Sequence, residues 1–234
     1  RAALPQDEVD MAQLVACAPE KPEVMRKDIE DTIDTFQSDG LKKIVREMLR
    51  LTGDKLEWFP AAQRLHHAER SGLLHHTTSM LNLARHVVAG YPFLNAELLY
   101  AGVILHDLCK TTEMISDETG SVSDYSADGL LIGHLVRGVA RIEEAAKNVG
   151  VSGEIVLLLE HMVLSHHSIP EYGSPKAPMF PEAEVLARID DLDAKMNEMQ
   201  GILSRVPEGA FSEKVWSLDR RIYHPKYQEI DGAE

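Results

Sequence analysis

The stretch Leu98–Asp107, which reads LLYAGVILHD, decides how this chain folds. It is an apolar run of helical length that ends on two ionisable residues, and Asn95 is a suitable N-cap for a buried helix over residues 96–109. A buried charge without a partner is costly, so His106 and Asp107 need one. A metal ion is one candidate. A capping aspartate beside a core histidine is the other, and the pair alone does not separate them.

Apolar periodicity predicts further helices on both sides of this stretch. They cover residues 28–37, 39–51, 72–88, 128–148, 153–166, 182–203 and 212–222. Ser38 and Ser212 are expected N-caps, and Pro181 fits the first turn of its helix. We expect a polar loop over residues 113–126 and no strands. The sequence therefore predicts an all-α helical bundle, with a linker or extended arm over residues 1–27 and one domain over residues 28–234.

Composition narrows the class of protein. The chain has 24 basic and 38 acidic residues, a net charge of -14, which argues against indiscriminate nucleic-acid binding but leaves room for a local basic channel. Its apolar runs are too short to cross a bilayer, so we expect no membrane partner. The two cysteines, Cys17 and Cys109, favour a cytoplasmic location. Basic residues at 42, 43, 46 and 50 mark either a solvated helix face or an edge that contacts phosphate.

Histidine is unusually abundant, and ten of the 11 histidines lie between His66 and His167. Several apolar helices each carry imidazole or carboxylate groups: His76, His106, Asp107, His134, His166, His167, Asp190 and Asp193. Facing helices that pool such groups form metal sites in bundle cores. Six or seven nitrogen and oxygen ligands without a thiolate favour two divalent transition metals, such as manganese, iron, cobalt or nickel. Two such metals activate water and hold a phosphate during its displacement.

The order of these residues resembles the HD superfamily of metal-dependent phosphohydrolases. The segments GLLHHTTSM (72–80) and LHDLCK (105–110) carry this resemblance, although the family usually has glycine where Cys109 stands. Further segments resemble the YhaM-type 3′-5′ exoribonucleases: Ala61-Ala62 with His66-His67, LLIGH (130–134), HMVLSHH (161–167), EYGSP (171–175) and IDDLDAKM (189–196). Members of that family typically carry an N-terminal OB-fold, so the resemblance covers only the linker and the HD part.

This resemblance implies a set of site residues. The metal ligands would be His76, His106, Asp107, His134, His166, His167 and Asp190, with Asp107 bridging the two metals and manganese favoured. Catalytic roles fall to Asp107, Lys110 and His161, and substrate contacts to Lys110, Lys195, His66 and His67. Asp193 would orient a ligand without touching a metal.

The implied activity is 3′-5′ hydrolysis of single-stranded RNA, or of DNA, to nucleoside 5′-monophosphates. Two alternatives stay open. The same centre can hydrolyse a small nucleotide or a cyclic dinucleotide, because the pocket walls and not the fold select the substrate. The domain can also be a binding module without catalysis. The C-terminal helices, over residues 182–203 and 212–222, can pack within the chain or against a partner, which leaves a homo-oligomer open.

Overall fold

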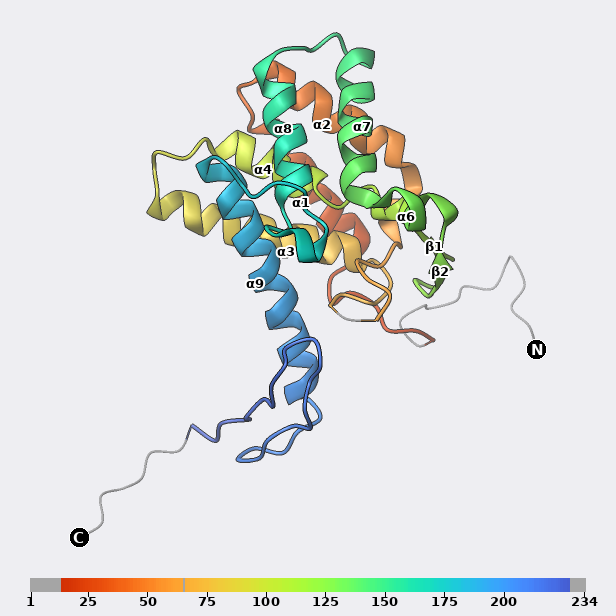
Figure 1. Cartoon of the computed structure of the whole chain (residues 1–234), viewed down its shortest axis with the longest axis vertical. Coiled ribbons are helices and arrows are strands. Elements are labelled where there is room, and N and C mark those ends of the chain that lie inside the picture. The colour runs from red at the N-terminus through yellow and green to blue at the C-terminus, as the bar shows by residue number, and fades with distance from the viewer. Residues whose placement is uncertain (1–13, 65, 228–234) are drawn as a thin grey trace.

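The computed structural model describes residues 14–64 and 66–227, and helices make up most of its regular structure (Figure 1). In chain order the elements are α1 (Pro22–Asp34), α2 (Asp39–Thr52), the 3-10 helix η2 (Gly53–Glu57), α3 (Gly72–Gly90), α4 (Ala96–Leu105), α5 (Lys110–Glu113), β1 (Met114–Ser116), β2 (Val122–Tyr125), α6 (Ala127–Leu131), α7 (Gly133–Asn148), α8 (Glu154–Ser165), the 3-10 helix η3 (Pro170–Tyr172) and α9 (Pro181–Leu203). The described residues contain a single two-stranded sheet, so the predicted all-α class is confirmed.

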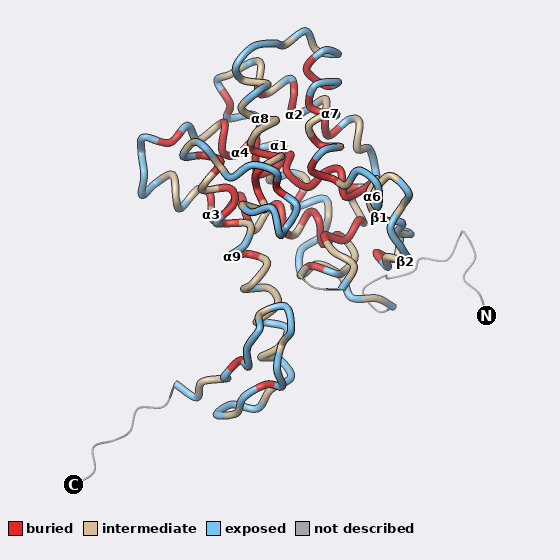
Figure 2. The backbone as a smooth tube through the Cα atoms, viewed as in Figure 1, coloured by how far each residue is buried: buried red, intermediate tan, exposed pale blue. Residues whose placement is uncertain are grey.

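Helix α4 is the centre of the bundle, since it packs against α1, α2, α3, α8 and α9. Seven of its ten residues are buried, and buried residues gather around it (Figure 2). Asn95 caps it as predicted, because its side chain accepts the N–H of Leu98 at 3.1 Å. Gly102 lets α8 approach closely: a Cβ there would lie 2.2 Å from Cε of Met162. The apolar run thus fixes where His106 and Asp107 emerge.

Two predicted helices are interrupted near the clustered histidines. Helix α4 ends at Leu105, and His106 to Cys109 form a turn before the short α5. The predicted helix over residues 128–148 breaks at Gly133, whose φ of +77° lies in the left-handed region that glycine adopts without strain. As a result His134 lies in the first turn of α7, so its side chain projects from a helix end.

The predicted polar loop over residues 113–126 is wrong in part, because it contains the hairpin of β1 and β2. These strands have three and four residues, too few for an alternating pattern to be recognised in the sequence. Ser126 follows the hairpin and caps α6, accepting the N–H of Gly129 at 2.9 Å. The hairpin therefore carries the chain from α5 back to the bundle.

The predicted arm over residues 1–27 is wrong from residue 22 onward, where α1 begins with Pro22 in its first turn. Met25 and Ile29 of this helix are buried in the core. Upstream, Ala18 donates its N–H to the Arg70 carbonyl at 2.9 Å, so this segment runs beside residue 70. Residues 1–13 lie outside the described part of the chain.

The predicted helix over residues 212–222 is also wrong. Ser212 caps no helix; its hydroxyl accepts the N–H of Ile222 at 2.8 Å and closes a loop. A helix this short needs packing to be stable, and Trp216 in its middle is 84% exposed. The last turns of α9 and the segment after it project away from the bundle (Figure 1). In the described ranges no helix is both long enough and apolar enough to traverse a bilayer.

Candidate metal centre

Helices α3, α4, α7, α8 and α9 bring the seven predicted ligands together in the bundle. His76 comes from the middle of α3, His106 and Asp107 from the turn after α4, His134 from the start of α7, His166 and His167 from the turn after α8, and Asp190 from α9. Each of the seven belongs to a set of three residues whose ligand atoms lie within 4.8 Å of one another. Residues far apart in the sequence therefore share one site.

Asp107 lies between two groups of ligands, and each of its oxygens faces one of them. Oδ2 lies 3.4 Å from Nε2 of His106, while Oδ1 lies 3.5 Å from Nε2 of His134 and 3.6 Å from Nε2 of His166. On the first side, Nε2 of His76 lies 3.2 Å from Oδ1 of Asp190. A carboxylate with one oxygen on each side is the arrangement that a bridging ligand requires.

The donor atoms of this cluster fit divalent metals. Oδ1 of Asp107 and Nε2 of His134 and His166 are buried, and the described structure offers them no hydrogen-bond partner. Buried polar atoms are seldom left unpaired, because the lost hydration is costly. The opposite ring nitrogens of His106 and His166 donate to the carbonyls of residues 103 and 163, both at 2.8 Å. A carbonyl only accepts, so Nδ1 carries the proton and Nε2 presents a lone pair to the centre.

In the metal-free cluster the surroundings hold Asp107 and His166 in the protonation states that metals need, but they favour the protonated form of His76, which a metal would have to displace. Burial raises the pKa of the Asp107 carboxyl, but the Lys110 ammonium, 2.6 Å away, and the neighbouring His106 and His166 together outweigh it and hold that pKa well below its usual range. Burial lowers the pKa of His166 to about 3, so its imidazole is neutral at pH 7. Burial also acts against charge on His76, yet hydrogen bonds to Asp190 and Asp193 raise its pKa to about 9.

Asp193 lies behind the cluster and contacts the predicted ligand His76. It is 6% exposed, and its Oδ2 lies 2.7 Å from Nδ1 of His76 and 2.8 Å from Nε2 of His67. The Ser79 hydroxyl donates to its other oxygen. Burial raises the pKa of Asp193, but its bonds to His67 and His76 outweigh this and lower it. Asp193 thereby fixes the ring orientation of a predicted ligand.

His67 does not occupy the place predicted for a substrate contact. Its side chain is 2% exposed and is held between Asp193 and His75, whose Nδ1 lies 3.1 Å away. Glu69 lies behind this pair, with Oε1 2.8 Å from Nδ1 of His75. The structure therefore assigns His67 to the support of Asp193. No spacing rule in the sequence pointed to this chain of contacts.

Glu113 is a second supporting residue that sequence analysis missed. Its Oε2 lies 2.7 Å from Nδ1 of His134, and its Oε1 accepts the backbone N–H of His134 at 3.3 Å. Burial raises the pKa of Glu113, but the hydrogen bonds from His134 and the nearby charges of His134 and Lys110 together outweigh it and lower that pKa. A carboxylate that holds the far nitrogen of a metal-binding histidine is a recurrent feature of metal sites. The only available signal was an acidic residue three positions after Lys110.

An open pocket of about 560 Å³ leads to the cluster. It is lined by His66, Lys110, His166, His167, Ser168, Ile169, Tyr172, Ala187, Arg188, Asp190, Asp191, Ala194 and Lys195. Three predicted substrate contacts, His66, Lys110 and Lys195, thus lie on its wall. Lys195 also bonds Asp191 at 2.6 Å. Burial and the nearby Lys110 charge lower the pKa of His66 to about 3.

His161, predicted as a catalytic residue, does not line this pocket. Its Nε2 accepts the backbone N–H of Met179 at 3.1 Å, and its ring packs beside Phe180 with centroids 5.4 Å apart. These contacts place the ring against the segment that leads into α9. The structure therefore gives His161 a packing role, and its predicted part in catalysis has no geometric support.

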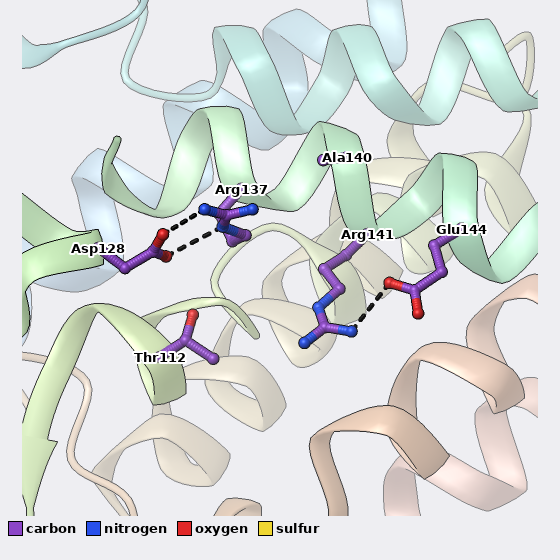
Figure 3. Close-up of a pocket in the computed structure, with 6 residues that line it drawn as sticks. All are labelled: Thr112, Asp128, Arg137, Ala140, Arg141 and Glu144. Carbon is purple, nitrogen blue, oxygen red and sulfur yellow. Dashed lines mark hydrogen bonds and ion pairs between the residues drawn. The ribbon is translucent and has the colours of Figure 1, made fainter. Parts of the chain in front are cut away.

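A separate pocket of about 490 Å³ lies beside α7 (Figure 3). Its two arginines are already paired, Arg137 with Asp128 and Arg141 with Glu144. The basic residues of α2 are similarly engaged, and Arg46 and Arg50 bond Asp34 and Glu47. These contacts favour the solvated-face interpretation of the basic stripe on α2.

Comparisons with known proteins agree with this geometry. The family model described as "HD domain" matches residues 73–195. A protein named 3'-5' exoribonuclease YhaM from Geobacillus sp. (strain WCH70) is 43% identical over 226 residues, which cover 96% of this chain and 68% of the relative. Proteins of the same name from Halalkalibacterium halodurans and Listeria monocytogenes serovar 1/2a are 40% and 41% identical. They align with 95% and 97% of this chain, and with 69% and 72% of their own lengths.

No solved structure matches the chain. The matched range of the family model nevertheless contains all seven predicted ligands, from His76 to Asp190. The relatives extend the match over nearly the whole chain. The chain therefore belongs to the HD-domain family and, within it, to the family of the YhaM 3'-5' exoribonucleases.

Proposed function

We propose that this chain is a metal-dependent phosphodiesterase that shortens single-stranded RNA from its 3′ end and releases nucleoside 5′-monophosphates. The observation that carries this proposal is the position of Asp107 between two groups of imidazoles, with its Oδ1 buried and unpaired. The relatives named 3'-5' exoribonuclease supply the direction of hydrolysis and the RNA substrate.

Two divalent cations, with manganese favoured and iron, cobalt and nickel as alternatives, suit this donor set of nitrogen and oxygen atoms. His76, His106 and Asp190 would hold one cation, and His134, His166 and His167 the other, with Asp107 between them. When bound, such a pair supplies a water of lowered pKa and positive charge for the phosphate.

The chain's own residues position the substrate. The Lys110 ammonium lines the pocket beside Asp107 and neutralises a phosphate oxygen as charge develops on it. His66 lines the same pocket and would contact the substrate as a neutral imidazole, because burial and Lys110 lower its pKa to about 3. Lys195 contacts the next phosphate from the rim, once it exchanges its partner Asp191 for the strand.

Further parts of the proposal concern the protein as a whole. The sequence places the HD domain over residues 28–234, and we propose that α1, which begins at Pro22, belongs to it as well. Two cysteines and the RNA substrate favour a cytoplasmic location. A homo-oligomer is supported by Met196 of α9, whose apolar side chain is 49% exposed. Sedimentation of the purified chain tests this last point.

The activity is tested with 5′-labelled single-stranded RNA and the manganese-loaded chain, with Asp107→Ala as the control. The expected product is a ladder that shrinks by one nucleotide at a time and is lost in the variant. An intact strand, with bound manganese confirmed, would overturn the exonuclease proposal. Small cyclic and linear nucleotides are then tested in the same assay, both as competitors of RNA and as substrates. This distinguishes RNA hydrolysis from the alternative activity on small phosphate compounds.

A further inference from the structure

Tyr172 lies at the pocket that leads to the metal centre, yet it serves no evident structural purpose. Its side chain is 69% exposed, and within the described residues its hydroxyl has no hydrogen-bond partner. Exposure alone is unremarkable for a single aromatic residue. What distinguishes Tyr172 is that the segment carrying it is held rigidly and is tied to a candidate metal ligand.

The turn around Tyr172 is fixed by backbone hydrogen bonds. Tyr172 donates its N–H to the carbonyl of Ile169 at 3.1 Å, and Gly173 donates to that of Pro170 at 2.9 Å. Gly173 has a φ of +102°, which glycine adopts without strain. The fully buried Ser174 accepts the N–H of His167 at 3.1 Å and closes the turn. A ring on such a turn loses little further freedom on binding.

The same turn fixes the distance between the tyrosine and the metal centre. The carbonyl of Tyr172 accepts a hydrogen bond from Nδ1 of His167 at 2.6 Å. His167 in turn belongs to the ligand set with His134 and His166. The exposed ring therefore belongs to a residue whose backbone directly contacts the predicted ligand His167.

The residues of α9 that line the same pocket add small and cationic groups to it. Helix α9 supplies Ala187 and Ala194 as small residues, and Arg188 and Lys195 as cations. The cations are already paired, Arg188 with Glu184 at 2.7 Å and Lys195 with Asp191 at 2.6 Å. With a net charge of -14 on the chain, charge alone is a weak source of affinity for RNA. Stacking on an aromatic ring is independent of net charge and of base identity.

We propose that Tyr172 is the stacking platform for a nucleobase of the single-stranded substrate at the mouth of the pocket. This inference rests on the proposed exonuclease function and names the group that holds the base. A platform that accepts every base suits an enzyme that removes successive nucleotides without regard to sequence. Tyr172 touches substrate in this proposal, so it should affect binding more than the chemical step.

The test compares Tyr172→Ala and Tyr172→Phe with a matched control, Tyr91→Ala, whose ring is 58% exposed on the connection between α3 and α4. We expect Tyr172→Ala to raise KM for single-stranded RNA by about 5- to 100-fold, the factor that stacking of one base represents. The value of kcat should stay within about twofold. Tyr172→Phe and Tyr91→Ala should resemble the wild type. Thermal unfolding verifies that each variant folds.

A second substrate makes the result specific to the base. With the wild-type chain, removing the last two nucleobases of the strand should raise KM by the same factor as Tyr172→Ala does. With Tyr172→Ala, removing these bases should raise KM no further. Binding can be measured in an Asp107→Ala background, which leaves the strand uncut. The fluorescence of a terminal 2-aminopurine should be quenched when residue 172 is tyrosine, and not in the double variant with Tyr172→Ala. An unchanged KM in Tyr172→Ala, with an active wild type, would overturn this inference alone. A wild type that cuts no RNA would overturn the proposed function and this inference with it.

Discussion

Replacing Glu113 with glutamine tests whether the metal centre depends on a carboxylate that does not itself face the centre. Glu113 accepts two hydrogen bonds from His134, one from the ring at 2.7 Å and one from the backbone at 3.3 Å. Its side chain is 14% exposed, so water screens these contacts little. Glutamine keeps the volume but removes the charge, and its amide nitrogen cannot accept either bond.

The structure gives this substitution a defined magnitude. Loss of such a supporting carboxylate typically weakens metal binding by about 10- to 100-fold, or roughly 1.4–2.7 kcal/mol. The effect should fall on the half of the centre that contains His134. The other half, with His76, His106 and Asp190, has its own support from Asp193 and should bind as before.

The assay is a calorimetric titration of manganese into the metal-free chain, with Glu143→Gln as the matched control. Glu143 is an exposed acidic residue on α7 that bonds Lys147 at 2.8 Å. Its replacement by glutamine should leave both manganese-binding events unchanged. In Glu113→Gln one of the two binding events should shift to lower affinity. The reasoning is refuted if both affinities match the wild type, or if both fall equally.

Three further predictions concern stability and reactivity. The neighbouring His67 and the hydrogen-bonded His75 lower the pKa of Glu69 from 4.5 to about 2. Its carboxylate therefore stabilises the fold above pH 4.5, and this contribution is lost as pH falls toward 2. Because Glu69 is partly exposed, Glu69→Gln should lower the free energy of unfolding by only about 1–2 kcal/mol at pH 7, and by less at pH 3, in denaturant titrations; an equal loss at both pH values would contradict this. Gly72→Ala would place a Cβ 1.9 Å from the carbonyl oxygen of His67. In thermal unfolding it should therefore destabilise the chain by about 1–3 kcal/mol. The control Gly90→Ala, which has open space around its Cβ, should leave the stability unchanged. Burial raises the pKa of the Cys109 thiol to about 12. Iodoacetamide at pH 8 should therefore leave Cys109 unmodified in the native chain, as measured by peptide mass spectrometry. Rapid alkylation would contradict this and show that the turn opens.

Much of the fold, and the clustering of histidines and aspartates in its core, could be predicted from the sequence, because local patterns encoded them. The apolar run before His106 predicted a buried central helix, and α4 is that helix. Histidines and aspartates on separate apolar helices predicted a shared cluster, and the seven residues meet in the core. Asn95 and Ser38 were recognised as N-caps, since capping depends on neighbours in the chain.

The parts that could not be predicted depend on contacts between distant residues. His67 reads as one of two adjacent histidines in a loop, and only the fold shows that Asp193 is its partner. The contact of Glu113 with His134 could not be predicted either, because it depends on the hairpin that lies between these residues in the chain. The expected helix over residues 212–222 failed for the opposite reason. Its local pattern was adequate, but no element of the described structure packs against Trp216.

The ends of α4 and α8 show why helix termination and metal binding coincide in this chain. The last carbonyls of a helix lack partners within it, and a side-chain donor can satisfy one of them. His106 and His166 each follow the last helical residue, and each donates Nδ1–H to the carbonyl three residues earlier, at 2.8 Å. That bond turns both Nε2 atoms toward Asp107. The same contact therefore ends the helix, sets the tautomer and aims the ligand, which explains why an apolar run closed by histidine occurs at both places.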